Sequence, residues 1–511
     1  MHRRDDVVLR DVVERNALET PDRECLIVEP EGTSWTCASA RDEGYRAANA
    51  LRTLGVARGD RVMIMLPNGS DWIRAWLGVS FLGAVVVPVN VSYRGPLLAY
   101  LVRDTAPVRI ISAGALAERF AEIDGAPQLL VDPAVLREGS VEPPALTAPL
   151  EAWDLAAVNY TSGTTGDSKG VLTTYTQVRA TGTPWEDRLE PGDTYLSVMP
   201  MFHISGTVPL TAVWALRGNF VLCSHFEGKR FLDIARRYGT TMAFLLGPMA
   251  GYLASLPPTP SDADNPIRRM IVVPLPADVD GFLQRYGIEE LCQVHAMTEL
   301  PPPVVTRGRI TDPTSCGPVS AGFELRVVDE HDIPVPTGEP GELIVRAQDP
   351  WVITHEYLNK PEETARAWRN GWFHTGDQVR LDERGEVHFV DRIKDAIRRR
   401  GENISSLEVE REIVRHPAVR EAACVPVPAE FGEDEVMAYL LLGEDATIDL
   451  PELVAFLSQR LAHFAVPRYF ELVDELPRTP TMKVRKTDLR KRGVSEATWD
   501  REAAGITLRR A

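Results

Sequence analysis

Apolar residues in the first third of the chain follow two spacings, one typical of helices and one typical of buried strands. Residues 41–54 are predicted to form an amphipathic helix, and residues 72–81 are predicted to form a second helix. Short apolar runs at 61–65 and 85–89 predict buried strands. Because helices that alternate with buried strands are typical of parallel sheets covered by helices, we expect an α/β fold.

The pattern changes after about residue 318, where strands dominate. A polar turn at 336–341 separates two predicted strands, and a dense charged run at 391–395 follows a third. Beyond that run the pattern is that of a small α+β unit, whose first helix begins at a capping box formed by Ser405 and Glu408. The predicted elements are strands at 324–328, 342–345, 385–390, 422–427 and 435–442, a helix from the capping box to about 415, and a helix at 451–462.

The chain has 511 residues, which is too long for one ordinary core. We place a hinge in the charged run, at 391–394, between an N-terminal domain of residues 1–390 and a C-terminal domain of residues 395–511. Apolar residues make up 44% and charged residues 25%, as in a soluble globular enzyme.

The formal net charge is −17, so neither nucleic acid nor an anionic membrane surface is an expected partner. Six cysteines form no CxxC pair, and no long apolar run follows the first residues. Both features favour a reduced, cytoplasmic location.

The most informative segment is a polar loop at 160–171. Five hydroxyl side chains, three glycines and one lysine fall between Thr161 and Gly170. Glycine lets backbone N–H groups approach an anion closely, hydroxyls donate further hydrogen bonds, and a lysine adds a charge suited to phosphate. The order of residues differs from the P-loop pattern, because Lys169 is followed by Gly170. The loop predicts a phosphate-binding site.

This loop resembles the phosphate loop of the adenylate-forming superfamily, which includes acyl-CoA synthetases, adenylation domains of peptide synthetases and firefly-type luciferases. Ser168 stands where that family usually has proline. The resemblance extends over essentially the whole chain. It implies a large N-terminal domain of β-sheets flanked by helices with a small β-barrel subdomain, and a small mobile α+β C-terminal domain. It implies that the nucleotide's phosphates are bound by Thr161, Ser162, Gly163, Thr164, Thr165, Gly166 and Lys169.

Two further motifs in the N-terminal domain resemble those of the family. The segment 199–206 is similar to a core motif in which His203 would line the acyl pocket and the pantetheine tunnel. In the Met297-Thr298-Glu299 element, Thr298 would contact the α-phosphate, and Glu299 would offer the hard oxygen ligand that Mg²⁺ prefers. The resemblance places the acyl pocket at Phe202, His203, Ile204, Gly206, Leu246, Gly247 and Met249. The apolar members of this set favour an apolar or bulky acid.

The remaining matching motifs lie near the hinge and beyond it. By resemblance, Asp377 and Arg392 would bind the ribose or phosphate of the nucleotide, and Lys394 would be the hinge residue. Lys483 would neutralise charge as the acyl-phosphate bond forms. The loop of Arg400, Gly401 and Glu402 would contact coenzyme A, although the arginines here could equally form a solvated face. The Gly-Glu-Asn-Ile-Ser form of this loop is similar to the carnitine-CoA ligase-like branch of acyl-CoA synthetases.

The function implied is AMP-forming ligation of a carboxylic acid to coenzyme A, with ATP and Mg²⁺ in the first half-reaction. The acid attacks the α-phosphate, pyrophosphate leaves, and the thiol of coenzyme A then displaces AMP from the acyl-AMP. The C-terminal domain would rotate about Lys394 between the two half-reactions. A homodimer is compatible with the sequence.

Three departures from the family's motifs affect adenylation. The adenine segments, which contain Pro274, Leu275, Pro276, His295, Ala296 and Met297, lack the usual glycines and tyrosine, and Tyr gives the better stacking face. Met482 replaces the glycine that usually precedes the catalytic lysine. An enzyme that acts mainly on a preformed acyl-adenylate is therefore one alternative. An adenylation enzyme that loads a carrier protein, a luciferase-type oxygenase and a non-catalytic binding scaffold are others.

Overall fold

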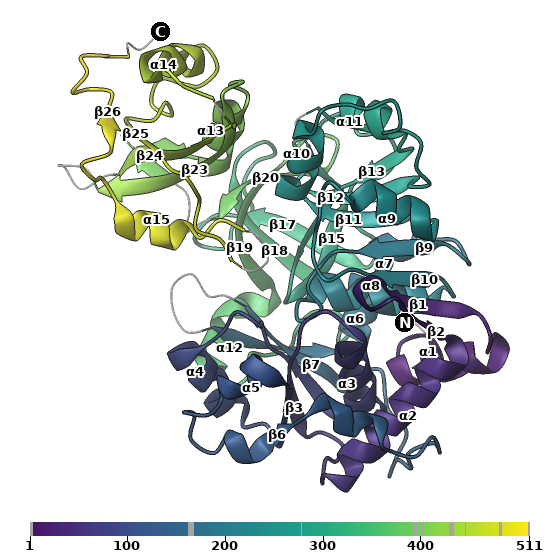
Figure 1. Cartoon of the computed structure of the whole chain (residues 1–511). Helices are drawn as coiled ribbons and strands as arrows, with labels where there is room; N and C mark the ends of the chain where they lie inside the picture. Colours follow the sequence, from purple (N-terminus) through teal and green to yellow (C-terminus); the bar gives the residue numbers. More distant parts are fainter. Residues whose placement is uncertain are drawn as a thin grey trace. The chain divides into compact units, whose positions relative to one another are not determined.

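We describe the protein from a computed structural model, which covers residues 4–161, 168–276, 278–392, 397–399, 402–428, 434–444, 446–479 and 483–508. Figure 1 shows its helices and strands in chain order. The chain forms two compact units. Unit 1 comprises Met1–Glu324 and Arg346–Phe373, and unit 2 comprises Leu325–Val345 and His374–Ala511. The division into units follows the density of internal contacts, whereas the hinge at 391–394 is predicted as the point about which the C-terminal domain rotates. The predicted domain boundary therefore stays a prediction.

Unit 1 contains a six-stranded sheet of order β6-β5-β3-β4-β7-β8. All neighbouring strands are parallel except β7 and β8, which are antiparallel and place Thr161 opposite Lys169. The two ends of the predicted phosphate loop are therefore held side by side. The strands are β3 (Arg61–Met65), β4 (Val85–Pro88), β5 (Arg109–Ser112), β6 (Leu130–Val131), β7 (Leu155–Thr161) and β8 (Lys169–Thr174).

A second, seven-stranded sheet of unit 1 has the order β13-β12-β11-β9-β10-β1-β2. Its neighbouring strands are parallel except for the antiparallel edge strand β2. Ligands of open parallel sheets bind beyond the carboxyl ends of the strands, so the residues after β9, β11 and β12 are of interest. The strands are β1 (Glu24–Val28), β2 (Thr33–Thr36), β9 (Thr194–Ser197), β10 (Asn219–Leu222), β11 (Met242–Leu246), β12 (Arg269–Val273) and β13 (Glu290–Cys292).

Helices pack around both sheets, as the alternating pattern predicted (Figure 1). The two predicted helices are confirmed as α2 (Cys37–Thr53), capped by the Thr36 hydroxyl, and α3 (Ser70–Phe81). The others are α1 (Leu9–Glu19), α4 (Gly95–Thr105), α5 (Gly114–Glu118), α6 (Tyr175–Thr181), α7 (Thr183–Glu186), α8 (Ile204–Ala215), α9 (Phe231–Tyr238), α10 (Gly247–Ser255), α11 (Val279–Tyr286) and α12 (Pro361–Ala367).

The contact between α2 and α3 requires glycine. A Cβ atom at Gly78 would lie 2.5 Å from the Ala47 Cβ and 2.9 Å from the Ala47 carbonyl carbon. We expect Gly78→Ala to destabilise unit 1 by roughly 1–3 kcal/mol because the two buried helices must separate. The matched control is Gly251→Ala in the exposed face of α10, where a Cβ meets nothing within 4 Å and alanine improves helix propensity. Thermal unfolding of both variants checks this, and equal melting temperatures would contradict it.

Four neighbouring strands of one sheet lie mostly in unit 2, in the order β20-β19-β18-β17, and β19 and β20 are antiparallel. They are β17 (Phe323–Val328), β18 (Gly341–Ala347), β19 (Phe373–Leu381) and β20 (Glu386–Arg392). The strands predicted at 324–328, 342–345 and 385–390 are confirmed. β20 extends two residues into the predicted charged break, because Asp391 and Arg392 pair with Gln378 and Asp377 of β19.

The remainder of unit 2 is the predicted α+β arrangement. The sheet β23-β24-β25-β26 packs with α13 and α14 around a core that includes Val409, Leu440 and Phe470. The Ser405 hydroxyl accepts from the Glu408 N–H, which confirms the predicted helix start, whereas α14 ends four residues earlier than predicted. The elements are β21 (Ile397–Arg399), β22 (Glu402–Ile404), α13 (Ser406–Val414), β23 (Val419–Pro428), β24 (Asp434–Leu442), α14 (Leu450–Ser458), β25 (Tyr469–Leu472), α15 (Lys486–Arg492) and β26 (Trp499–Asp500).

Candidate active site

Thr298 and Glu299 occupy the tight turn between β14 (Val294–Met297) and β15 (Leu300–Val305), not a helix start. The Gln177 side-chain amide donates to the carbonyl oxygens of Thr298 (2.9 Å) and Glu299 (3.2 Å), and the Thr354 N–H also donates to the Glu299 carbonyl at 2.9 Å. These bonds fix the backbone of the turn. The Glu299 side chain therefore starts from a fixed point of the backbone.

A tyrosine that the sequence did not single out joins Glu299 to Lys169. The Tyr357 hydroxyl donates to Glu299 Oε1 at 3.0 Å, and Lys169 Nζ lies 5.0 Å from the centre of the same ring. Burial, with the adjacent Glu299 carboxylate, raises the pKa of Tyr357, so the phenol stays protonated and remains a donor. One aromatic ring thus contacts both a carboxylate suited to a divalent cation and an ammonium suited to phosphate.

Lys169 also forms an ion pair with Glu363 of α12, with 2.8 Å between Nζ and Oε2. The hydrogen bond from Lys169 lowers the pKa of the Glu363 carboxyl. Both side chains are about one-third exposed, so the pair is accessible to solvent. Sequence reasoning missed Glu363 because it lies 194 positions from Lys169, and only the fold brings the two together.

The predicted loop residues Ser162, Gly163, Thr164, Thr165 and Gly166 lie outside the described residues. The residues that flank them are firmly held. The Tyr100 hydroxyl donates to the Ser168 carbonyl at 3.0 Å, and the Tyr160 hydroxyl donates to Asp104 at 2.5 Å.

Residues of the predicted acyl pocket and of a predicted adenine segment lie at the ends of three neighbouring strands. Phe202 and His203 follow β9, Leu246 ends β11, and Pro274 follows β12. Gly247 lies so close to Pro274 that a Cβ would be 2.8 Å from the proline ring. The structure therefore brings the predicted acyl and adenine segments together at the carboxyl end of one sheet.

His203 is the N-cap of α8. Its Nδ1 accepts from the Ser205 N–H at 3.1 Å and lies 2.8 Å from the Ser205 hydroxyl. Gly206 is buried against the Pro200 carbonyl, which leaves no room for a side chain. Phe202, His203, Ile204, Leu246 and Gly247 are half-buried, and Met249 is buried.

The predicted adenine segments are held by hydrogen bonds and strand pairing of their own. The Leu275 N–H donates to the Gln293 side-chain oxygen at 3.0 Å, which fixes the segment of Pro274, Leu275 and Pro276. His295 lies on β14 opposite Val304, followed by the exposed Ala296 and by Met297. Gln293 was not predicted as a site residue, and its role becomes visible only in the fold.

In unit 2, Asp377 and Arg392 face each other across β19 and β20 with 3.4 Å between Oδ1 and Nε. The Asp377 side chain is only 5% exposed. Lys483 is exposed, and its N–H and C=O both bond to Thr479, which closes the segment that carries it.

The predicted hinge residue Lys394 and the coenzyme A contacts Arg400 and Gly401 lie outside the described residues, as does the side chain of Glu402. Arg399 is neither a solvated arginine nor free to meet a phosphate. It is 2% exposed, forms an ion pair with Glu435 at 2.6 Å and donates to the Phe464 carbonyl at 2.7 Å. The expectation that the arginines of this segment form a solvated face is therefore wrong for Arg399, and the contact of Arg400 with coenzyme A stays a prediction.

Two models of one protein family match this chain over most of its length. The model of the AMP-binding enzyme family matches residues 13–358, and the model of the AMP-binding enzyme C-terminal domain matches residues 408–483. The chain belongs to the AMP-binding enzyme family. Its predicted membership of the adenylate-forming enzymes of the acyl-CoA synthetase type is confirmed.

Relatives of this AMP-binding enzyme match it along nearly its whole length. A crotonobetaine/carnitine–CoA ligase of Salmonella typhi is 31% identical over 498 residues, which cover 92% of this chain and 96% of that protein. ATP-bound MatB from Rhodopseudomonas palustris superimposes with a TM-score of 0.85 at 26% identity, covering 95% of this chain and 98% of the other. The AMP complex of the O-succinylbenzoate coenzyme A synthetase MenE from Bacillus subtilis gives 0.82 at 25% identity, covering 94% and 98%.

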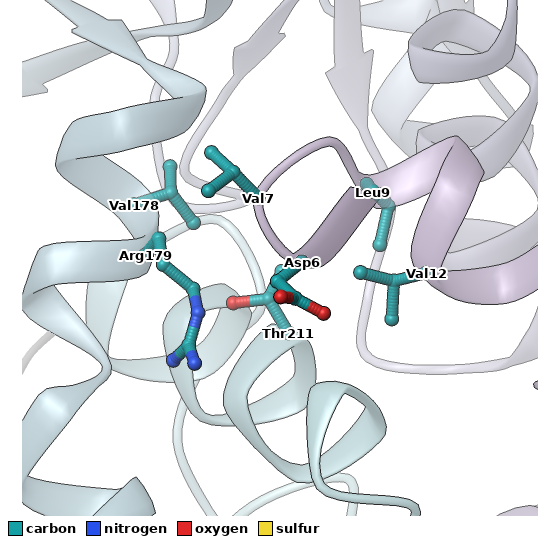
Figure 2. Close-up of a pocket in the computed structure, with 7 residues that line it drawn as sticks. All are labelled: Asp6, Val7, Leu9, Val12, Val178, Arg179 and Thr211. Carbon is teal, nitrogen blue, oxygen red and sulfur yellow. The ribbon is translucent and has the colours of Figure 1, made fainter. Parts of the chain in front are cut away.

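A small pocket of this AMP-binding enzyme lies elsewhere, between the N-terminal segment and helices α6 and α8 (Figure 2). It is lined by Asp6, Val7, Leu9, Val12, Val178, Arg179 and Thr211, none of which is a predicted site residue.

Among the described residues, no helix combines the length and the apolar character needed to cross a bilayer.

Proposed function

We propose that this AMP-binding enzyme activates a carboxylic acid as an acyl-AMP and transfers the acyl group to coenzyme A. The observation that carries the proposal is the arrangement of Glu299, Tyr357 and Lys169 beside the ends of the phosphate loop. It offers a buried carboxylate and an ammonium at one place, as the triphosphate of ATP and its divalent cation require. The names of the similar proteins, which include coenzyme A ligases, support the same chemistry.

The residues present fit a magnesium ion, because Glu299 offers an anionic oxygen in a fixed turn. Mg²⁺, when bound, would neutralise charge on the phosphates. Lys169 would bind phosphate after exchanging its partner Glu363 for the nucleotide. Thr298 would donate to the α-phosphate, and Asp377 would accept hydrogen bonds from the ribose hydroxyls, with Arg392 beside it.

In the first half-reaction, a carboxylate oxygen of the acid forms a bond to the α-phosphorus, and the bond to the leaving pyrophosphate breaks. Lys483 would offset the repulsion between the two anions. In the second, the thiol of coenzyme A loses its proton to solvent and attacks the acyl carbon, and AMP leaves. We propose that a rotation about Lys394 separates the two steps.

The acid is proposed to be apolar or bulky. The side chains of Phe202, Ile204, Leu246 and Met249 are apolar, and those of Phe202, Ile204 and Leu246 are half-buried. His203 is already engaged at the start of α8. An acid with a second carboxylate would find no cation among these pocket residues.

The test is a panel of carboxylic acids with ATP, Mg²⁺ and coenzyme A, read by mass spectrometry, together with acid-dependent pyrophosphate exchange. Rapid exchange and an acyl-CoA product support the proposal. Product from preformed acyl-AMP without exchange would instead assign the enzyme to acyl transfer alone. Product on a holo-carrier protein but not on coenzyme A would make it a carrier-loading enzyme.

Tyr357→Phe is expected to slow pyrophosphate exchange by about tenfold while the protein folds normally. The ring that contacts Lys169 remains, but Glu299 loses the hydrogen bond that orients it, and a bond to a charged group is worth roughly 1.5–3 kcal/mol. The dependence of the rate on Mg²⁺ concentration should shift to higher values. Tyr252→Phe, whose ring is on the exposed face of α10, is the matched control. An unchanged Mg²⁺ dependence in Tyr357→Phe would contradict the role of this hydroxyl.

A further inference from the structure

Glu342 contacts the strand segment that precedes the predicted ribose-binding residue Asp377, using both oxygens of its carboxylate. Glu342 lies near the start of β18, which neighbours β19, the strand that carries His374, Thr375, Gly376 and Asp377. Oε1 accepts from the Gly376 N–H at 3.1 Å, and Oε2 lies 3.0 Å from His374 Nδ1. The Glu342 side chain is 12% exposed and that of His374 is 3% exposed. The contact between Glu342 and His374 is therefore largely shielded from water, and the charged acceptor strengthens both interactions of this carboxylate.

The backbone of β19 is locally irregular at Gly376, where such a restraint matters. Gly376 has a φ of +70° and is exposed, and a Cβ there would meet nothing within 4 Å. A glycine has no side chain that could pack against its neighbours, and its φ and ψ angles are only weakly restricted. The Thr375 hydroxyl donates to the Leu343 carbonyl at 2.7 Å and accepts from the Asp377 N–H at 3.1 Å. Thr375 thus anchors one side of Gly376, and Glu342 holds the Gly376 N–H itself.

The direction of the Asp377 side chain depends on the backbone at Gly376. Asp377 directly follows Gly376, is almost buried and has its carboxylate 3.4 Å from Arg392. A carboxylate that must accept from two adjacent hydroxyls tolerates little displacement. A rotation of the backbone at Gly376 would move that carboxylate relative to its partner strand.

We propose that Glu342 is a positioning residue for nucleotide recognition: it fixes Gly376, and through it directs the Asp377 carboxylate toward the ribose hydroxyls. The inference rests on the proposed function, in which Asp377 binds the ribose. His374 completes the arrangement, because its second ring nitrogen lies 3.8 Å from Asp332 Oδ2 in the turn after β17. The buried imidazole thereby links the two carboxylates to the first residues of β19.

A divalent cation is the competing interpretation, since Asp332, Glu342 and His374 place one possible ligand atom each within 4.8 Å of one another. The contacts favour hydrogen bonding. A cation ligated by Glu342 would compete with the Gly376 N–H, which already points at that carboxylate. The tests below separate the two.

The experiment compares ATP with 2′-deoxy-ATP in acid-dependent pyrophosphate exchange, for the wild type, Glu342→Ala and Glu342→Gln. We expect the wild type to favour ATP, and Glu342→Ala to reduce that preference by about tenfold, mainly through the KM for ATP. Glu342→Gln should restore most of it, because an amide oxygen still accepts from the Gly376 N–H. Glu339→Ala, three residues earlier in an exposed turn, is the matched control and should behave as the wild type.

The ratio between two nucleotides is measured within one variant, so it does not depend on the fraction of folded protein. An equal loss with both nucleotides, or an unchanged preference in Glu342→Ala, would overturn the inference. A third outcome would also overturn it. If wild-type protein is treated with a chelator, Mg²⁺ is then restored, and the preference for ATP over 2′-deoxy-ATP is lost, a tightly held cation positions Asp377. If the wild type shows no exchange, the proposed function fails, and calorimetric binding of AMP against 2′-deoxy-AMP still decides the role of Glu342.

Discussion

Lys483→Ala is expected to lower pyrophosphate exchange by about 10²- to 10³-fold, which is the usual cost of removing one group that stabilises charge in a transition state. Lys483 is exposed, and its backbone N–H and C=O both bond to Thr479. An exposed side chain contributes little to packing, so its removal should leave the fold unchanged.

The same substitution should spare the second half-reaction. Acyl transfer from preformed acyl-AMP to coenzyme A is expected to fall by less than about fivefold, because that step makes and breaks bonds at the acyl carbon and leaves every bond to the phosphorus intact. Lys491→Ala, an exposed lysine at the end of α15 in the same unit, is the control for loss of positive charge. An equal loss in both half-reactions would contradict the role assigned to Lys483.

Lys486→Met is expected to destabilise unit 2 by roughly 3–5 kcal/mol, the cost of leaving a buried charge without its partner. Lys486 Nζ lies 2.7 Å from Glu410 Oε1 and donates to the Ser406 hydroxyl at 2.5 Å, and both charged side chains are less than one-fifth exposed. Burial by itself lowers the pKa of Lys486, but the Glu410 and Asp391 carboxylates outweigh it and raise the pKa, so the lysine is charged.

This network joins the end of β20 to α13, because Asp391 accepts from both the N–H (2.7 Å) and the hydroxyl (2.5 Å) of Ser406. Without Lys486, Glu410 and Asp391 would remain as two carboxylates near one site. Hydrogen exchange should therefore increase in α13 and β23, and the melting temperature should fall. Combining Glu410→Gln with Lys486→Met should recover part of the loss.

The matched control lies one residue away. Arg485→Met removes the exposed ion pair with Asp488, whose side chains are 52% and 39% exposed, and such surface pairs are worth roughly 0–1 kcal/mol. Equal effects of Arg485→Met and Lys486→Met would show that burial of the pair is not what stabilises this unit.

Interactions between residues close in the sequence allowed several helices and strands to be predicted. The helix start at Ser405 and the strands β3 and β18 follow from capping and apolar spacing, which act within a few residues. The end of β20 was misjudged because charged residues usually end a strand, whereas here pairing with β19 carries the strand through Asp391 and Arg392. The buried state of Arg399 had no sequence signal either, since its partner Glu435 and the Phe464 carbonyl come from distant segments.

By itself, the sequence determined the family and the order of the motifs, because loops that bind phosphate depend on glycines and hydroxyls that are contiguous in the chain. Only the tertiary structure decided which side chains support those motifs. Tyr357 reaches Glu299 across 58 positions, and Glu342 reaches Gly376 across 34. Such contacts depend on how strands and helices pack, and packing brings together residues that no local pattern connects.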